Sequence, residues 1–388
     1  MNQPIRLAAF LSHPVQYYSP WFAELASYVE LKVYYALGNR SADQAEAGFG
    51  VEFDWDIDLL AGYEAEFLHN VATPPQLAGF SGCDVPEVRA LLRAESPDAI
   101  LIFGWHKKFY WQVLAAAFFL RIPVFVRVDS QLESPRSTLK RFVKYLPYRM
   151  VLPIVAHYLC PGERAEKYLT HYGVPSSRIH RVPHMIDVSR FAEGSLNANE
   201  VRAEHGALDD QVVLLFVGKL IEKKHPKTVI KALRELSPGV RSRFVIWYVG
   251  SGALNDGIEN ESELGDVAIR LLGFRNQSEL PSIYAAADCL ILPSDGGETW
   301  GLVVNETMAC GTPAIVSSEV GAGPDLIESG ETGWVFPFGN IASLAELLKG
   351  LTRESLSSMA PALKRKTGTF SYETGSVAFL DAVREVLR

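Results

Sequence analysis

Cysteine is scarce in this chain, whose 388 residues contain four, none of them in a Cys-x-x-Cys pair. Because no histidine lies at a metal-ligand interval from any of them, the spacing excludes a zinc site, and it also excludes a disulfide framework. The apolar start of the chain ends at Ser12, which predicts a strand and not a signal peptide. We therefore expect a cytoplasmic protein, since reduced thiols are normal in that compartment.

Long apolar runs and an excess of positive charge are also missing. The run closest to a membrane span, residues 109–120, falls well short of the ~20 residues that cross a bilayer. Lys and Arg number 37 against 45 Asp and Glu, so the net charge is -8 and a nucleic-acid partner is not expected. What the chain does contain is 48% apolar residues, which is enough for two or three packed domains.

Short apolar runs alternate with helical patterns from one end of the chain to the other, which is typical of α/β domains with parallel sheets and crossover helices. A first series lies in residues 1–187 and a second in residues 212–370, and the polar segment 188–211 has the composition of a linker. We expect two Rossmann-like domains that face a cleft, followed by a helix at residues 371–388. Ligands of such sheets bind beyond the carboxyl ends of the strands.

Residues 289–316 are the segment richest in candidate chemistry. A buried strand is followed by a glycine-containing loop and a helix that we expect to start near Trp300. The N-terminus of this helix would direct free amides at the cleft, which suits an anion. Glu298 in the loop and Glu306 on the helix suit a ligand that presents hydroxyls beside its phosphates. Alternatively, Glu298 only complements the helix dipole and Glu306 only faces solvent.

A glycine and two lysines follow the first expected strand of the second domain. Gly218, Lys219 and Lys224 would lie at the same carboxyl edge as the helix N-terminus. Two cations in that place can stabilise a diphosphate without a divalent metal, so we expect neither a metal ion nor another cofactor. The alternative is an ordinary basic turn.

The order of these residues resembles the C-terminal signature of the GT-B glycosyltransferases of family four, retaining enzymes that use nucleotide sugars. The resemblance covers most of the chain and implies a GT-B fold whose second domain binds the donor and whose first domain binds the acceptor. It rests on Gly218-Lys219-Leu220, Lys224, Val249-Gly250-Ser251-Gly252, Asp288 to Ser294, Glu298 and Glu306 with seven residues between them, and Met308 to Pro313.

The resemblance also implies roles for single residues. Lys219 and Lys224 would contact the donor diphosphate. Glu298 would hold hydroxyls of the donor sugar, and Glu306 would hold the ribose. The remaining positions expected in the donor site are Gly218, Gly250, Gly252, Gly273, Phe274, Trp300, Gly301, Leu302 and Val303.

In the first domain, a histidine ends an expected strand. The family carries a histidine after this strand that faces the donor sugar, so His106 is the catalytic candidate of this domain; the alternative is a turn or core residue. The loop after the first strand lacks the glycine pair that the family usually has there. Its His13, Gln16 and Tyr17 are expected to shape the acceptor side instead.

Two other patterns leave alternatives open. Asp54-x-Asp56 matches the manganese motif of the unrelated GT-A glycosyltransferases, but an exposed strand has the same alternation, and we expect no metal there. Residues 136–149 carry five basic residues, no acidic residue and interleaved aromatic residues. They form either a solvated helix face with a core stripe or a surface for anionic lipid headgroups.

The sequence therefore predicts a retaining hexosyltransferase that moves a sugar from a UDP- or GDP-linked donor to a hydroxyl acceptor. The expected acceptor is a glycan or a lipid-linked glycan of surface polysaccharide assembly, with peripheral contact to the inner face of the cytoplasmic membrane through residues 136–149. The resemblance also implies that the helix at 371–388 packs back on the first domain. The alternatives are a GT-B sugar-nucleotide epimerase and a non-catalytic module that binds a nucleotide sugar.

Overall fold

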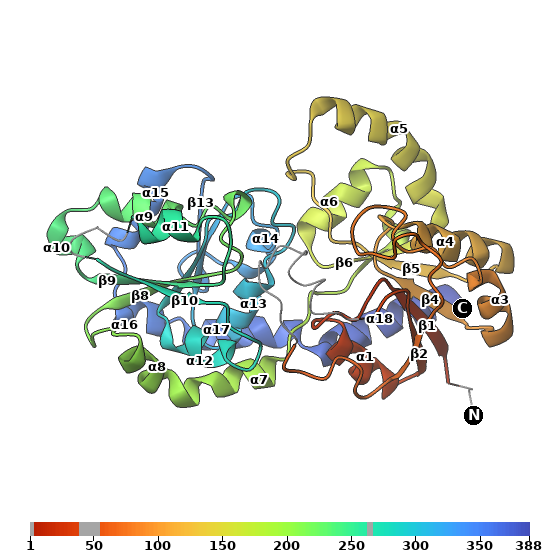
Figure 1. Cartoon of the computed structure of the whole chain (residues 1–388), viewed down its shortest axis with the longest axis horizontal. Helices are drawn as coiled ribbons and strands as arrows, with labels where there is room; N and C mark the ends of the chain where they lie inside the picture. Colours follow the sequence, from red (N-terminus) through yellow and green to blue (C-terminus); the bar gives the residue numbers. More distant parts are fainter. Residues whose placement is uncertain (1–3, 39–54, 262–266) are drawn as a thin grey trace.

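The first of two α/β domains contains a sheet of seven parallel strands (Figure 1). The structure is a computed structural model that describes residues 4–38, 55–261 and 267–388, and this count covers those residues. The sheet has the order β3-β2-β1-β4-β5-β6-β7. Its strands are β1 (Arg6–Leu11), β2 (Glu30–Tyr35), β3 (Glu64–Phe67), β4 (Ala99–Ile102), β5 (Val124–Arg127), β6 (His157–Cys160) and β7 (Ile179–Arg181). Its helices are α1 (Ser19–Ala26), α3 (Val88–Glu95), α4 (Lys108–Leu120), α5 (Thr138–Val155) and α6 (Glu163–His171), with a 3-10 turn, η2 (Ser176–Arg178).

The second domain repeats this plan with six parallel strands among the described residues, in the order β10-β9-β8-β11-β12-β13. Its strands are β8 (Val212–Val217), β9 (Phe244–Val249), β10 (Ala268–Gly273), β11 (Cys289–Leu292), β12 (Ala314–Ser317) and β13 (Gly333–Phe336). Its helices include α9 (Thr228–Arg234), α10 (Pro238–Arg241), α11 (Asn255–Glu259), α12 (Leu280–Ala286), α13 (Leu302–Ala309), α14 (Gly323–Leu326), α15 (Ile341–Lys349), α16 (Arg353–Ser357) and α17 (Ala360–Thr367). Two 3-10 turns, η4 (Glu222–Lys224) and η5 (Gly368–Phe370), complete it.

Both sheets reverse their strand order at a central pair of strands. The chain runs outward through β2 and β3 on one side of β1 and through β4 to β7 on the other, and β8 and β11 divide the second sheet in the same way. The carboxyl ends of such central strands are where open α/β sheets bind ligands. Two Rossmann-like domains with parallel sheets confirm the predicted fold class.

Residues 188–211, which we expected to be a linker, fold with the second domain. They form α7 (Val188–Glu193), η3 (Gly194–Asn197) and α8 (Ala198–Glu204), which pack against α12 and α13. Phe191 of α7 is almost completely buried in the core of the second domain. The composition of the segment did not indicate this packing, because only a few of its side chains are buried and most of its residues are polar.

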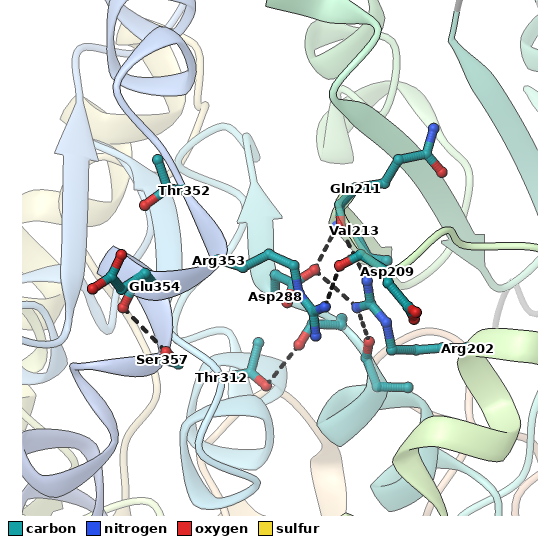
Figure 2. A network of polar contacts seen from close by, with 12 residues as sticks. Arg202, Asp209, Gln211, Val213, Asp288, Thr312, Thr352, Arg353, Glu354 and Ser357 are labelled. Carbon is teal, nitrogen blue, oxygen red and sulfur yellow. Dashed lines mark hydrogen bonds and ion pairs between the residues drawn. The ribbon is translucent and has the colours of Figure 1, made fainter.

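A buried ion pair fastens α8 to the second sheet, as Figure 2 shows. Arg202 donates from Nη1 to Asp288 Oδ2 at 2.9 Å, and the same oxygen accepts the Val213 amide at 2.7 Å. Asp288 Oδ1 accepts from Arg353 Nε at 3.0 Å. Removal of one partner of such a pair typically costs about 3–5 kcal/mol. The network therefore joins α8, the start of β8 and α16 into one body.

The C-terminal helix α18 (Tyr372–Leu387) crosses from the second domain to the first (Figure 1). It packs against α1 and β7, and its Phe379 and Val383 lie in the first domain's core. The Phe379 ring meets Trp21 edge-on, with 5.6 Å between the centroids. Among the described residues, every helix is too short or too polar to traverse a lipid bilayer.

Candidate active site

A pocket of about 130 Å³ lies between the two domains at the carboxyl ends of β8 and β9. The loops that follow these two strands begin with Gly218 and Gly250, and both glycines line the pocket. Six of the residues expected in the donor site gather here: Gly218, Lys219, Gly250, Phe274, Val303 and Glu306. Gln16 and Tyr17, which we expected on the acceptor side, line this same pocket from the first domain.

Close approach of the two glycine loops explains the residue at position 250. Gly250 has a φ of 124°, and a Cβ atom there would lie 2.1 Å from the Gly218 carbonyl oxygen. Gly301, the N-cap of α13, has a φ of 101°, which L-residues rarely adopt. The first amides of α13 follow it and have no carbonyl acceptor within the helix. Since Val303 lines the pocket, this end of the helix faces the ligand space.

Glu306 is a buried carboxylate with one free oxygen. Its Oε2 accepts from Tyr284 Oη at 2.6 Å, whereas Oε1 has no hydrogen-bond partner among the described residues. Burial raises the pKa of Glu306, and the hydrogen bond from Tyr284, the charge of Arg190 and the nearby Tyr17 hydroxyl oppose that rise. An unpartnered buried acceptor calls for an explanation, and a ligand hydroxyl that donates to Oε1 would supply it. The alternative prediction, that Glu306 faces solvent, is therefore wrong.

Lys224 and Glu298 form an ion pair through Nζ and Oε2, and both side chains are mostly buried. Ser294 Oγ donates to the same carboxylate oxygen at 3.2 Å. The Glu298 amide donates to the carbonyl of Asp295 at 2.9 Å, which fixes the loop that carries it. The two residues expected to act on the diphosphate and on the sugar are thus held together beside Gly218, whose Cβ position would lie 3.9 Å from Lys224 Cε.

Lys219 is half-buried in the pocket. Desolvation, together with the charges of Lys223 and Lys224, lowers its pKa below the usual range. Three lysines within one short segment repel one another. An anion that binds between them reduces this repulsion and stabilises the segment. This is the behaviour expected of a phosphate-binding loop.

Seven residues of the predicted donor site lie outside the pocket lining: Lys224, Gly252, Gly273, Glu298, Trp300, Gly301 and Leu302. Trp300 belongs to the second domain's core, where its indole Nε1 donates to Asn305 Oδ1 at 2.8 Å. The Gly273 carbonyl oxygen accepts a hydrogen bond from the Gly250 amide at 2.8 Å and so fixes the position of the glycine loop. We expected the helix to start near Trp300; because Gly301 is left-handed, α13 begins at Leu302.

His106 and His13 lie together in a second, larger cavity of about 700 Å³. All the residues that line it lie between Leu11 and Tyr168, within the first domain. Burial and the neighbouring Lys107 lower the pKa of His106, which keeps its imidazole neutral at pH 7. The structure therefore places His106 on the side of the first domain and does not bring it into the pocket of Lys219 and Glu306.

One residue that joins the two domains carries no recognisable sequence signal. Gln131 follows β5 and is buried, and its Nε2 donates to the carbonyl oxygens of Gly296, Glu298 and Glu319 at 2.8, 3.1 and 3.2 Å. Arg164 of α6 donates to Gln131 Oε1 and to the Glu319 carbonyl. The first domain thus holds the backbone of the loop that carries Glu298.

Other lining residues were missed because they carry no recognisable sequence signal. Tyr284 lies in α12, whose apolar composition predicts only a core helix, and Arg275 and Gln277 follow β10 in an irregular loop. Of the Asp54-x-Asp56 motif, Asp54 lies outside the described residues. Asp56 lies in a bend and not in a strand, and its Oδ2 accepts the Ser278 amide of the second domain at 3.0 Å.

Two family models match the chain. The model for glycosyl transferases group 1 matches residues 197–366 and the model for glycosyltransferase family 4 matches residues 56–190, so together they account for more than half of the chain. Among curated relatives, the D-inositol 3-phosphate glycosyltransferase of Actinosynnema mirum is 31% identical over 236 residues, which are 56% of this chain and 55% of the relative. The chain spans about half the length of the curated relatives it matches.

Solved structures share the whole fold. The Anabaena protein HepE in complex with UDP has a TM-score of 0.71 to this chain at 16% identity and covers 98% of this chain and 100% of its own. WaaG, described as a glycosyltransferase involved in lipopolysaccharide biosynthesis, has a TM-score of 0.62 at 17% identity, with 97% and 98% covered. At these identities the likeness shows the fold alone. The matched family models and the GT-B architecture confirm the resemblance found in the sequence: the chain belongs to family four of the GT-B glycosyltransferases.

Proposed function

We propose that this protein is a retaining glycosyltransferase that moves a sugar from a UDP- or GDP-linked donor to a hydroxyl group of a glycan or lipid-linked glycan. One observation carries the proposal. The pocket between the domains combines a buried carboxylate with a free oxygen, Glu306, with a half-buried cation, Lys219, and with the N-terminal end of α13. These groups complement the ribose hydroxyls and the diphosphate of one nucleotide sugar.

The catalytic contribution of the chain is to stabilise the leaving group. As the bond between the sugar C1 and the diphosphate oxygen breaks, negative charge grows on the diphosphate, where Lys219, Lys224 and the α13 amides would neutralise it. The acceptor oxygen bonds to C1 on the same face, and its proton passes to the departing phosphate oxygen. Glu298 would accept hydrogen bonds from the sugar hydroxyls and hold C1 in line. Because lysines provide the positive charge, the step needs no divalent metal.

In this proposal the first domain binds the acceptor. The curated relatives carry the name D-inositol 3-phosphate glycosyltransferase, and WaaG is described as acting in lipopolysaccharide biosynthesis. The first name contains a phosphorylated polyol, and the second description gives lipopolysaccharide biosynthesis as the process. They support an acceptor in surface glycan or glycolipid assembly.

Helix α5 supports a peripheral contact with the membrane. It stands at the outer edge of the first domain (Figure 1), and Phe142, Leu139 and Leu146 are 80%, 72% and 62% exposed. Exposed apolar side chains of this size are not expected on a purely solvated helix face. The five basic residues of 136–149 form no ion pair with any residue that the structure describes. Exposed apolar groups between unpaired cations are typical of helices that lie in the headgroup region of anionic lipid.

A panel of UDP- and GDP-sugars tests the activity without knowledge of the acceptor. The purified protein is incubated with each donor, and release of the nucleoside diphosphate and the anomeric form of the freed sugar are followed by NMR. We expect slow hydrolysis of one donor with retention. Recovery of an epimerised donor would instead show an epimerase, and saturable binding without any turnover would show a non-catalytic module.

A further inference from the structure

The cavity of about 700 Å³ in the first domain lies at the carboxyl ends of its central strands, and α5 forms part of its wall. Leu11, Phe103 and Val128 line it where β1, β4 and β5 end. Lys144 and Tyr148 line it from α5. The same helix that presents apolar side chains to the outside therefore closes this cavity on its inner face.

Positive charge dominates the cavity. Arg127, Arg136 and Lys144 line it, against a single lining carboxylate, that of Asp129. Asp129 Oδ1 is 3.1 Å from His184 Nε2, so that carboxylate is already engaged. Arg136 and Lys144 form no ion pair with any residue of the described ranges 4–38, 55–261 and 267–388. A cavity with unpaired cations attracts an anion.

Arg127 adds a fixed charge to this cavity. It is 2% exposed, its Nη1 and Nη2 donate to the carbonyls of Val182 and Pro183, and its buried Nε has no hydrogen-bond partner among the described residues. The charge of Asp129 acts on Arg127, but no ion pair joins the two residues, so the buried guanidinium still costs free energy, which a bound anion would lower. Part of the positive potential of the cavity therefore comes from a buried residue, Arg127, and not from surface lysines alone.

The aromatic walls of the cavity are held in place by hydrogen bonds. Trp105 Nε1 donates to Tyr148 Oη at 3.1 Å, and Trp111 Nε1 donates to the Trp105 carbonyl at 2.9 Å. Because both indole N–H groups are engaged within the protein, the rings present apolar surface to a ligand. A ligand that fits has an anionic group next to a less polar body.

We propose that this cavity binds the acceptor through a phosphate ester, which Arg136 and Lys144 hold beside α5. The inference rests on the proposed function, since it names the acceptor class for that activity. A guanidinium and an ammonium group together match the charge of a phosphate ester and donate charge-assisted hydrogen bonds to its oxygens. The phosphate ester can belong to a lipid headgroup or to a free sugar or polyol phosphate.

Calorimetric titration with defined probes tests the cavity in the full chain. The probes are sn-glycerol 3-phosphate, monomeric dihexanoyl phosphatidic acid and, as the uncharged control, glycerol. We expect both phosphates to bind and glycerol not to bind. The double variant Arg136→Ala/Lys144→Ala should weaken phosphate binding by about tenfold or more, because it removes two charge-assisted contacts. Lys167→Ala, on α6 beside the lining residue Tyr168 but outside the cavity lining, is the control and should bind like the wild type.

The outcomes separate the sources of the phosphate and the two proposals. Tighter binding of the lipid phosphate indicates a lipid headgroup, and equal binding indicates that a free phosphate ester suffices. Phosphate binding that survives in the double variant, equal binding of glycerol, or no binding to the wild type would overturn the inference. UDP and GDP are titrated onto the same samples: if either nucleotide binds and the phosphate probes do not, only the acceptor inference fails, and if neither nucleotide binds, the proposed function fails by itself.

Discussion

Lys224 Nζ and Glu298 Oε2 form an ion pair at the edge of the donor pocket, and both side chains are about 15% exposed. The resemblance assigns Lys224 to the diphosphate of the donor and Glu298 to its sugar, and the two side chains are in direct contact. A bound nucleotide sugar would insert hydroxyls and phosphate oxygens next to this pair. The pair holds the carboxylate in place before the donor arrives, which is what preorganised catalysis requires.

Replacement of Glu298 by glutamine tests this arrangement. Glu298→Gln keeps the shape of the side chain but removes the negative charge, so we expect kcat to fall by about 100-fold or more. The melting temperature should change little. Glu222→Gln, an exposed carboxylate in η4 beside Lys224, is the control and should retain the wild-type rate. A Glu298→Gln enzyme that turns over at nearly the wild-type rate would contradict the role of Glu298.

Nucleotide affinity should depend on pH through Glu306. Burial raises the pKa of this carboxyl above its ordinary value, and the ionised form accepts hydrogen bonds from hydroxyl groups more strongly than the protonated form. Affinity for UDP or GDP should therefore fall as the pH decreases through that raised pKa. Glu306→Gln should bind the nucleotide about tenfold or more weakly and lose this part of the pH dependence. Titrations at several pH values between about 8 and 5 measure both effects; identical pH profiles for variant and wild type would contradict the assignment.

Gln131 should couple domain closure to turnover. Gln131→Ala leaves the Gly296 carbonyl without its donor and removes one of the two donors to the carbonyls of Glu298 and Glu319, which should cost the contact between the domains about 1–3 kcal/mol. We expect a larger radius of gyration in the presence of nucleotide, measured by small-angle X-ray scattering, and a lower kcat. Gln112→Ala provides a control, since the Gln112 side chain bonds within the first domain. Closure and kcat that are unchanged in Gln131→Ala would show that the contact is incidental.

The exposed apolar residues of α5 should determine membrane binding. We expect the protein to co-sediment with vesicles that contain phosphatidylglycerol and not with neutral vesicles. The double variant Phe142→Gln/Leu146→Gln should lose most of this binding, because it removes apolar area that would enter the headgroup region. Phe118→Gln, which changes an equally exposed phenylalanine on α4, is the matched control. Binding that ignores the anionic lipid content would refute the membrane contact.

Activity should not require a divalent metal. In the proposed mechanism Lys219 and Lys224 would provide the positive charge next to the donor, so turnover should be the same in EDTA and in added Mg²⁺ or Mn²⁺. Lys219→Ala should lose turnover that the metals do not restore. Loss of wild-type activity in EDTA, with recovery on addition of metal, would contradict this part of the proposal.

The sequence predicted the buried parts of the fold best. Parallel strands such as β8 and β9 are continuous apolar runs between turn residues, and these are recognisable without a structure. The edge strand β3 was missed, because its sequence Glu-Ala-Glu-Phe is polar and mostly exposed. The segment 188–211 was taken for a linker for a related reason: its packing depends on a few residues, Phe191 and Arg202 above all, within a polar composition.

The candidate site was predictable where residues are adjacent in sequence and not where the fold brings them together. Gly218, Lys219 and Gly250 follow strands, so their common edge could be derived from the strand pattern. Tyr284 and Gln131 could not be found in this way, because each meets the donor loop or Glu306 only after the chain has folded. The position of Tyr17 in the pocket also could not be derived from the sequence, because it depends on how the two domains meet.

The most direct test of the account is a crystal structure with UDP or GDP bound. The account predicts that the ribose hydroxyls lie within hydrogen-bond distance of Glu306 Oε1 and that the diphosphate contacts Lys219 and the first amides of α13. A nucleotide bound in the first-domain cavity, with the pocket of Glu306 empty, would contradict it.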